Sequence, residues 1–264
     1  MSYEIKRETH VHGKPWGKVA SGYFSDKRMA GDYVAAIMSV ARSSKPSAIV
    51  DLGGGTGFIF EQLIEAGLAE TIKLVILDES ESQLAMCKNP RITPMKGACQ
   101  SFRRADIMDE TGSMMLICRS VLHYAGIFGQ KSWLNHVRSQ MKPGEWFVHQ
   151  AGCSDDIEGA LELDVLFELM GVDKWVPHKE ALVRLLVQAG FEIKDDFPMP
   201  PAEMISGELG VRYGVSPETL ARIEADLRRT CANRPDLFKI TPAGFIFNFP
   251  YRVFLCKAVE YFTA

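Results

Sequence analysis

The chain has 264 residues, of which 47% are apolar and 24% are charged. This composition is typical of a globular protein, and the length suits one α/β domain with an insertion or two small domains. The formal net charge of −3 indicates no basic surface for nucleic acid. No apolar run approaches the roughly 18 residues that a membrane-spanning helix needs. We therefore expect neither a nucleic-acid partner nor a membrane segment.

The N-terminal segment MSYEIKRETHVHGKPWGK lacks the apolar core of a signal peptide, and Glu4 and Glu8 are unusual in a transit peptide. The six cysteines lie far apart and form no CxxC pair, which favours reduced thiols over a disulfide framework. These features predict a cytoplasmic protein. His10 and His12 have no third ligand nearby in the sequence, so we expect no metal site.

Helical and strand patterns alternate through the first part of the chain. Helices are predicted at 26–43, 58–66, 82–88 and 131–141, and strands at 48–52, 73–77, 92–95, 114–119 and 145–150. Such alternation indicates a parallel, doubly wound sheet with helices on both faces.

The pattern is less regular after residue 152. Helices are predicted at 156–170 and 179–189, a sixth strand after AGFEI, a proline-rich break at 198–204 and a charged helix at 217–231. The segments 245–249 and 251–257 read as hairpin strands that close the sheet. We expect a Rossmann-like α/β fold with seven strands, mostly parallel with an antiparallel C-terminal strand. An arm and helix at 1–45 precede the main domain, 46–264, which carries a helical insertion at about 198–240.

Residues 50–57 read VDLGGGTG and connect the first strand to a helix. So many glycines are costly unless the backbone turns sharply or a ligand approaches it closely. A phosphate-binding loop needs a Lys followed by Ser or Thr, which the chain lacks after Gly57. The nicotinamide fingerprint GxGxxG fails because Phe58 occupies the last glycine position. What remains is an acid followed by GxGxG, formed by Asp51, Gly53, Gly55 and Gly57.

The second strand ends in Asp78, which follows Gly57 by 21 residues (78 − 57). A carboxylate at about this distance accepts hydrogen bonds from a ribose diol. The alternative is that Asp78 starts a turn or caps the next helix. Asp51 is less specific: it could orient the loop amides, lie near an ammonium group, or be structural.

The segments VDLGGGTG, LVILDES, MKGACQSF, LICRSVLHY, MKPGEWFVHQ and LLVQAGFEI resemble, in this order, the motifs of the class I S-adenosylmethionine-dependent methyltransferases. The resemblance spans roughly residues 30–195 and is greatest to members that methylate small molecules. It implies S-adenosyl-L-methionine as cofactor, S-adenosyl-L-homocysteine as product, and an N-terminal arm that covers the cofactor site. The chain reads RSVL where enzymes that methylate exocyclic amines carry a Pro-Pro motif, which disfavours such substrates.

The resemblance also implies roles for individual residues. Gly53, Gly55 and Gly57 would pass under the methionine moiety, and Asp78 would hold the ribose hydroxyls. Further cofactor contacts are implied for Glu79, Ala98 and Cys99 beside the adenine, and for Arg119, Ser120, Tyr23 and Arg28 at the methionine end. Family members often carry an Asp where this chain has Ala98, so adenine recognition must rest on backbone groups or on neighbours.

The expected reaction is an in-line attack of a small-molecule acceptor on the sulfonium methyl group, for which a general base is optional. His123 and His149 follow or end the fourth and fifth strands and are candidate bases, although each could be a packed structural histidine. Candidate acceptor-binding aromatics are Tyr124, Trp175, Phe247 and Tyr251, any of which could instead belong to the core. Two alternatives are a non-catalytic cofactor-binding sensor or partner subunit and, less favoured, a nicotinamide-dependent reductase. The oligomeric state is open, with a homodimer as one option.

Overall fold

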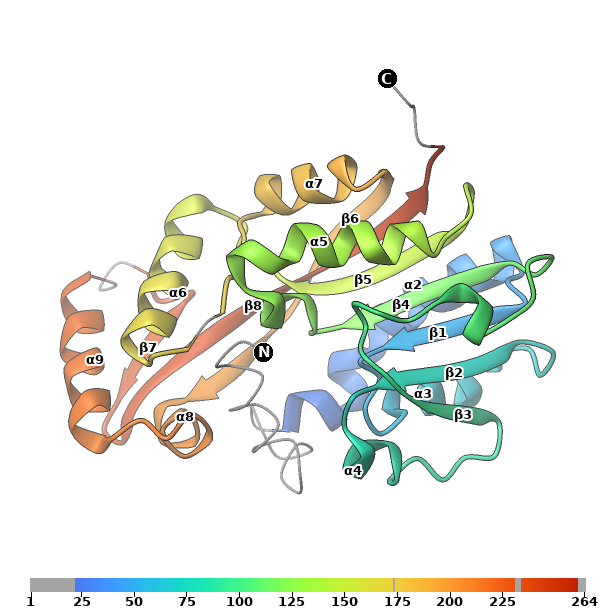
Figure 1. Ribbon diagram of the computed structural model, residues 1–264. Helices are drawn as coiled ribbons and strands as arrows, with labels where there is room; N and C mark the ends of the chain where they lie inside the picture. Colours follow the sequence, from blue (N-terminus) through green and yellow to red (C-terminus); the bar gives the residue numbers. More distant parts are fainter. Residues whose placement is uncertain (1–21, 173, 231–233, 261–264) are drawn as a thin grey trace.

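The computed structural model describes residues 22–172, 174–230 and 234–260 (Figure 1). Within these residues, eight strands form a single sheet with the order β3-β2-β1-β4-β5-β8-β6, and β7 pairs with β8. The first five strands are mutually parallel: β1 (Ala48–Leu52), β2 (Lys73–Asp78), β3 (Ile92–Lys96), β4 (Met114–Arg119) and β5 (Trp146–Gly152). The long β8 (Gly244–Ala258) runs antiparallel between β5 and β6 (Phe191–Ile205), and β7 (Phe238–Thr241) is short. The predicted fold class is confirmed.

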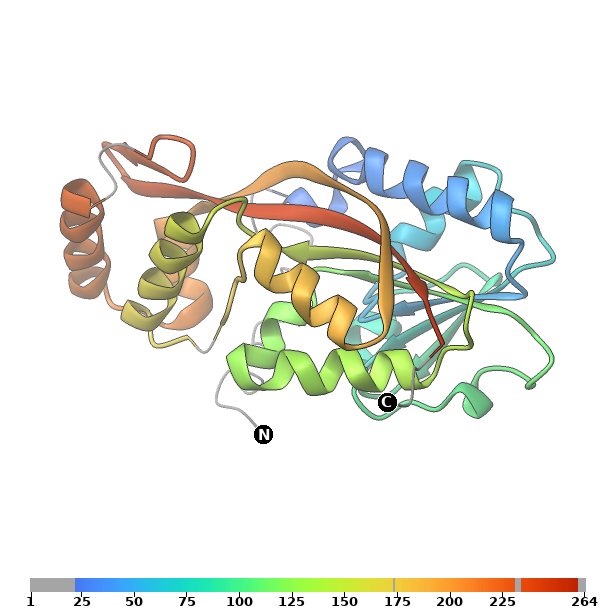
Figure 2. The ribbon, with the colours of Figure 1, turned by 90° about the horizontal axis from the view of Figure 1, so that it is seen from above.

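Helices cover both faces of the parallel strands (Figures 1 and 2). The helices α2 (Lys27–Ser44) and α3 (Phe58–Glu65) lie on one face, and α5 (Gly126–Ser139) and α7 (Lys179–Gln188) lie on the other. The remaining helical elements are α4 (Glu81–Leu84), α6 (Ile157–Leu169), α8 (Ser206–Tyr213), α9 (Pro217–Thr230) and two short 3-10 turns, η2 (Arg104–Asp106) and η3 (Leu122–Ala125). None of the helices in the described ranges has both the length and the apolar character of a membrane span.

Local sequence explains where α2 begins and ends. The side chain of Asp26 accepts the N–H of Arg28 and so caps the first turn, and the helix stops at Lys45, which has a left-handed conformation. Between them, Tyr33 and Ile37 face the sheet and are completely buried. The Tyr33 hydroxyl lies between β4 and β5, where it accepts the N–H of Cys118 at 3.0 Å. The helix therefore fixes the strand ends that border the site.

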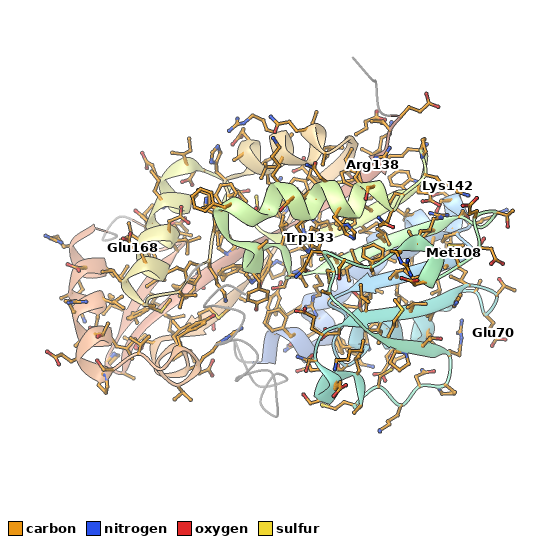
Figure 3. The ribbon with its side chains drawn as sticks, in the orientation of Figure 1. Glu70, Met108, Trp133, Arg138, Lys142 and Glu168 are labelled. Carbon is orange, nitrogen blue, oxygen red and sulfur yellow. The ribbon has the colours of Figure 1, made fainter. Side chains whose placement is uncertain are left out.

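The two faces of the sheet carry separate apolar clusters. Ile49 and Ile117 face α2 and α3, whereas Leu116 and Phe147 face α5 and α7. Figure 3 shows Trp133 on the side of α5 that faces the sheet, where its ring centroid lies 6.3 Å from that of Phe147. Apolar burial on both faces matches the continuous apolar runs of a central parallel sheet.

Two predictions about the C-terminal part are wrong. The proline-rich segment 198–204 is not a break, because β6 continues through it as the outermost strand of the main order. Prolines are tolerated on an edge strand and at a bulge, and the register of β6 shifts between Met199 and Ala202. The segments 245–249 and 251–257 do not form a hairpin but one strand, β8, that passes through Pro250.

The long β6 and β8 extend beyond β5 and carry α8, α9 and β7 between them, with α6 packed nearby (Figure 1). The helical part of the region at 198–240 therefore lies at 206–230, after the end of β6. The division between an N-terminal arm and helix at 1–45 and a main domain at 46–264 stays a prediction.

Candidate active site

A cavity of about 710 Å³ opens at the carboxyl ends of β1, β2 and β4. This volume is within the range of cofactor and ligand sites, and ligands of open α/β sheets bind at this edge. Nine residues predicted for the site line it: Asp51, Gly53, Gly55, Asp78, Glu79, Cys99, Arg119, Ser120 and Tyr124. The structure thus brings together side chains from four separate sequence motifs.

The glycine loop after β1 requires glycine for two physical reasons. Gly53 and Gly55 have φ angles of 73° and 56°, in the left-handed region that other residues rarely adopt. A Cβ atom on Gly53 would lie 2.5 Å from Val121 Cγ2, and one on Gly55 would lie 2.3 Å from Gln83 Oε1. The loop therefore presents bare backbone to the cavity.

Asp78 connects this loop to the end of β2. Its Oδ2 accepts the N–H of Gly55 at 2.9 Å, and its Oδ1 accepts the N–H of Ser80 at 2.8 Å. The second bond is the turn-forming role considered from the sequence, and the first belongs to the cavity. The turn-forming role of Asp78 is therefore observed, and its contact with a ribose stays a prediction.

Asp51 lies beneath the loop and is only 2% exposed. Burial, and secondly the nearby carboxylate of Asp78, raise the pKa of Asp51 to about 7. Burial likewise raises the pKa of the Cys99 thiol well above its usual value, so this cavity-lining cysteine is protonated at neutral pH. Asp51 therefore carries less negative charge at neutral pH than an ordinary aspartate.

Arg119, the last residue of β4, organises the segment before α2. Its guanidinium donates hydrogen bonds to the carbonyls of Tyr23 at 3.3 Å and Phe24 at 3.2 Å, and to Gln150 Oε1 at 3.2 Å. The guanidinium carbon also lies 5.4–5.8 Å from the ring centroids of Tyr23, Phe24 and Phe58. Burial lowers the pKa of Arg119. Phe24 consequently lines the cavity, whereas Tyr23 lies behind it.

Ser120 has a strained backbone at the cavity wall, with a φ angle of 62°. Its N–H donates to the carbonyl of Gln150 at 2.8 Å, and its Oγ lies 2.5 Å from the hydroxyl of Tyr251. Tyr251 is buried and stacks on Tyr23 at 5.4 Å between ring centroids. The pair Ser120–Tyr251 joins the main cavity to the aromatic region behind it.

A second, much smaller cavity of about 10 Å³ lies in that region. It is lined by three predicted site residues, His123, Phe247 and Tyr251, while Tyr124 and Phe24 line both cavities. His123 is 3% exposed, and its ring centroid lies 4.2 Å from that of Tyr124. His123 is therefore adjacent to the main cavity but separated from it by Tyr124.

Six predicted site residues are not among those that line either of these cavities: Tyr23, Arg28, Gly57, Ala98, His149 and Trp175. Arg28 is on the surface, where it forms an ion pair with Asp26 at 2.7 Å. His149 is completely buried, and its ring centroid lies 5.0 Å from that of Phe147. Among the described residues neither ring nitrogen of His149 has a hydrogen-bond partner, and burial lowers its pKa to about 3.

Sequence reasoning did not identify several cavity residues. Phe24, Gln83, Gln100, Val121 and Trp133 line the main cavity. Their place in the cavity depends on how the chain folds. Gln83 alone has a local signal, because it follows the Ser80 helix cap by three residues and so points back toward the glycine loop. His10 and His12 lie outside the described residues. Within the described part of the chain, no group of three His, Cys, Asp or Glu side chains could hold a metal ion.

The fold is similar to that of several solved structures. A protein of Bacillus halodurans C-125 that is provisionally named a methyltransferase has a TM-score of 0.68 and 14% identity, covering 87% of this chain and all (100%) of that one. The 1,6-didemethyltoxoflavin-N1-methyltransferase of Burkholderia thailandensis, whose structure holds 1,6-didemethyltoxoflavin and S-adenosylhomocysteine, has a TM-score of 0.56 and 14% identity, covering 98% and 92%. A cyclopropane synthase of Mycobacterium tuberculosis has a TM-score of 0.53 and 12% identity, covering 84% and 83%.

No protein-family model matches the chain, and neither does any curated protein sequence. The solved structures therefore establish the fold, and the chain has the fold of the class I S-adenosylmethionine-dependent methyltransferases. The resemblance inferred from the ordered motifs is confirmed at this level.

Proposed function

We propose that the protein is a methyltransferase that transfers the methyl group of S-adenosyl-L-methionine to a small molecule and releases S-adenosyl-L-homocysteine. The observation that carries this proposal is the link between Gly55 and Asp78 at the mouth of the 710 Å³ cavity. It places a glycine backbone and a strand-end carboxylate side by side, as binding of a nucleoside requires. Two structural neighbours of this chain are named as methyltransferases and were crystallised with S-adenosylhomocysteine.

The residues present fit this cofactor. Asp78 would accept the ribose hydroxyls, the bare backbone at Gly53 and Gly55 would pass the methionine moiety, and Glu79 and Cys99 would flank the adenine. Arg119 and Ser120 would lie at the methionine end, where Phe24 covers the cavity. When bound, the cofactor supplies an electrophilic methyl group on a sulfonium ion.

The protein's contribution is then mainly orientation and exclusion of water. Holding two reactants in line can lower the barrier by roughly 7–11 kcal/mol, so an obvious base is optional. Tyr124, Phe247 and Tyr251 would bound the acceptor. His123 is the candidate base for an acceptor that must lose a proton, because it lies next to Tyr124 in η3, which follows β4. We assign His149 no role as a base, because it is buried in the core.

Other functions on this fold remain as alternatives with distinct signatures. A structural neighbour is named a cyclopropane synthase, so the fold alone does not fix the chemistry. A non-catalytic cofactor-binding subunit would bind S-adenosylhomocysteine without turnover. A nicotinamide-dependent reductase is disfavoured because Phe58 replaces the last glycine of its fingerprint and starts α3.

A small acceptor is supported by the net charge of −3, which offers no footprint for nucleic acid, and by the cavity volume of about 710 Å³. Reduced thiols in the sequence support a cytoplasmic location. A homodimer stays a proposal that a measurement of molecular mass in solution can test.

The proposed reaction can be tested with S-adenosylmethionine carrying an isotopically labelled methyl group. The protein is incubated with this cofactor and an extract of small metabolites, and the products are analysed by mass spectrometry. We expect the label in a small molecule together with release of S-adenosylhomocysteine. Binding of S-adenosylhomocysteine without any labelled product would favour the non-catalytic alternative.

A further inference from the structure

The indole of Trp133 forms part of the wall of the main cavity and carries a hydrogen-bond donor without a partner. Trp133 lines this cavity and is only 5% exposed. Within the described part of the chain, no group accepts a hydrogen bond from its Nε1–H, and Nε1 is not one of the unpaired polar atoms that are sealed in the core. Since the N–H of a buried tryptophan usually finds a partner, this donor indicates a ligand that fills the cavity beside it.

The helix α5 places Trp133 beside the loop that follows β3. One turn after Trp133, His136 Nε2 lies 3.0 Å from the carbonyl oxygen of Phe102, and the centroids of the two rings are 5.4 Å apart. Three residues separate Trp133 from His136, and three separate Cys99 from Phe102. The helix and the loop lie side by side, and Trp133 and Cys99 belong to the same apolar cluster and line the same cavity. Trp133 is therefore a neighbour of Cys99 in the cavity wall.

This part of the wall lies at the adenine end of the proposed cofactor site. Asp78 is the proposed ribose contact, and Arg119 and Phe24 lie at the proposed methionine end. Phe24 belongs to the apolar cluster on the α2 and α3 face of the sheet, whereas Cys99 and Trp133 belong to the cluster beneath α5. The base of a nucleoside bound at Asp78 therefore extends toward Cys99 and Trp133, away from Phe24.

The adenine end offers few other groups that could read the edge of the base. Ala98 occupies the position at which the resembling enzymes often carry Asp, and it is not among the residues that line the cavity. The protonated thiol of Cys99 is only a weak donor and acceptor. The Trp133 indole is a better donor, and the ring nitrogens N1, N3 and N7 of adenine are acceptors. A hydrogen bond between them would satisfy a buried donor and orient the base at once.

We propose that Trp133 determines specificity for the base of the cofactor by donating a hydrogen bond from its indole N–H to a ring nitrogen of adenine. This inference rests on the proposed function. The indole is held in place from behind, because its ring centroid lies 6.3 Å from those of both Phe147 and His149 (Figure 3). A donor with a fixed direction discriminates strongly, since a base without an acceptor at that point leaves the buried N–H unpaired. Trp133 therefore selects bases that carry this nitrogen.

The test uses S-adenosylhomocysteine and three analogues, 1-deaza, 3-deaza and 7-deaza, each of which has carbon in place of one ring nitrogen. Each ligand is titrated by calorimetry into wild-type protein and into Trp133→Phe, which keeps an aromatic ring but has no N–H. We expect Trp133→Phe to bind S-adenosylhomocysteine about 2- to 10-fold more weakly, as loss of one neutral hydrogen bond implies. One analogue should bind the wild-type protein more weakly and lose no further affinity in the variant, whereas the other two should show the full loss.

The matched control is Trp146→Phe, because Trp146 begins β5 at the opposite edge of the sheet and is not among the residues that line the cavity. This variant should keep the wild-type Kd for all four ligands. A wild-type Kd in Trp133→Phe, or an equal loss for all four ligands, would assign Trp133 a packing role only and overturn the inference. Equal affinities of the wild-type protein for all four ligands would overturn it even if Trp133→Phe does not fold. These results leave the proposed function intact, whereas a wild-type protein that does not bind S-adenosylhomocysteine contradicts both.

Discussion

The Asp78→Asn substitution tests the proposed ribose contact most sharply. The carboxylate of Asp78 accepts two backbone hydrogen bonds, from Gly55 and Ser80, and it lines the main cavity. Asn retains one acceptor oxygen of similar position but loses the negative charge, and it cannot accept at both oxygens. A hydrogen bond to a charged group contributes about 1.5–3 kcal/mol, which corresponds to about a 10- to 150-fold change in affinity. We therefore expect the Kd for S-adenosylhomocysteine to rise by about that factor.

Calorimetry at neutral pH measures this change directly. The matched control is Asp109→Asn, which removes an exposed carboxylate between η2 and β4 and should leave the Kd unchanged. Thermal denaturation of both variants shows whether the loss of the Gly55 bond has unfolded the loop or the whole protein. A folded Asp78→Asn protein with the wild-type Kd would refute the assignment of Asp78 to the ligand.

Three further predictions follow from single residues. Gly55→Val should abolish binding of S-adenosylhomocysteine, because a β-branched residue cannot readily adopt its φ of 56°; retention of wild-type affinity in the folded variant would show that the loop has another role. Asp51→Asn should flatten the dependence of the free energy of unfolding on pH. In the wild-type protein, the Asp51 carboxyl has a pKa of about 7 when folded and about 4 when unfolded, so the free energy of unfolding falls by about 1.4 kcal/mol per pH unit as the pH rises from about 4 to 7. Chemical denaturation of wild type and variant across this window checks the sign, and identical pH profiles would contradict it. His123→Gln should keep affinity for S-adenosylhomocysteine but lower turnover by roughly 10²-fold in the labelled-methyl assay, whereas unchanged turnover would reduce catalysis to orientation alone.

The sequence predicted that the glycine loop and Asp78 lie together at one edge of the sheet, because both positions are set by local order. A strand, a glycine turn and a helix follow one another directly, and the next parallel strand must end at the same edge of the sheet. The five parallel strands were found for the same reason. His149 and His123 show the limit of this reasoning. His123 follows β4, and His149 lies near the end of the neighbouring strand β5. The alternation of side chains along β5 nevertheless directs His149 to the face of the sheet that carries Phe147 and is covered by α5.

The parts that the sequence did not predict depend on contacts between distant segments. Arg119 holds the carbonyls of Tyr23 and Phe24, almost a hundred residues earlier in the chain, while Arg28 is held on the surface by Asp26. No local pattern distinguishes these two arginines. The continuation of β6 through three prolines was also hidden, because an edge position and a bulge, which make proline tolerable, exist only in the assembled sheet.

The central claim is that the cavity at the ends of β1, β2 and β4 binds S-adenosylmethionine. Calorimetric titration of S-adenosylhomocysteine and of NAD into the wild-type protein tests it most directly. The account predicts that one S-adenosylhomocysteine binds per chain, that S-adenosylmethionine displaces it, and that NAD produces no heat of binding. A folded protein that binds NAD, or that binds neither S-adenosyl compound, would contradict the claim.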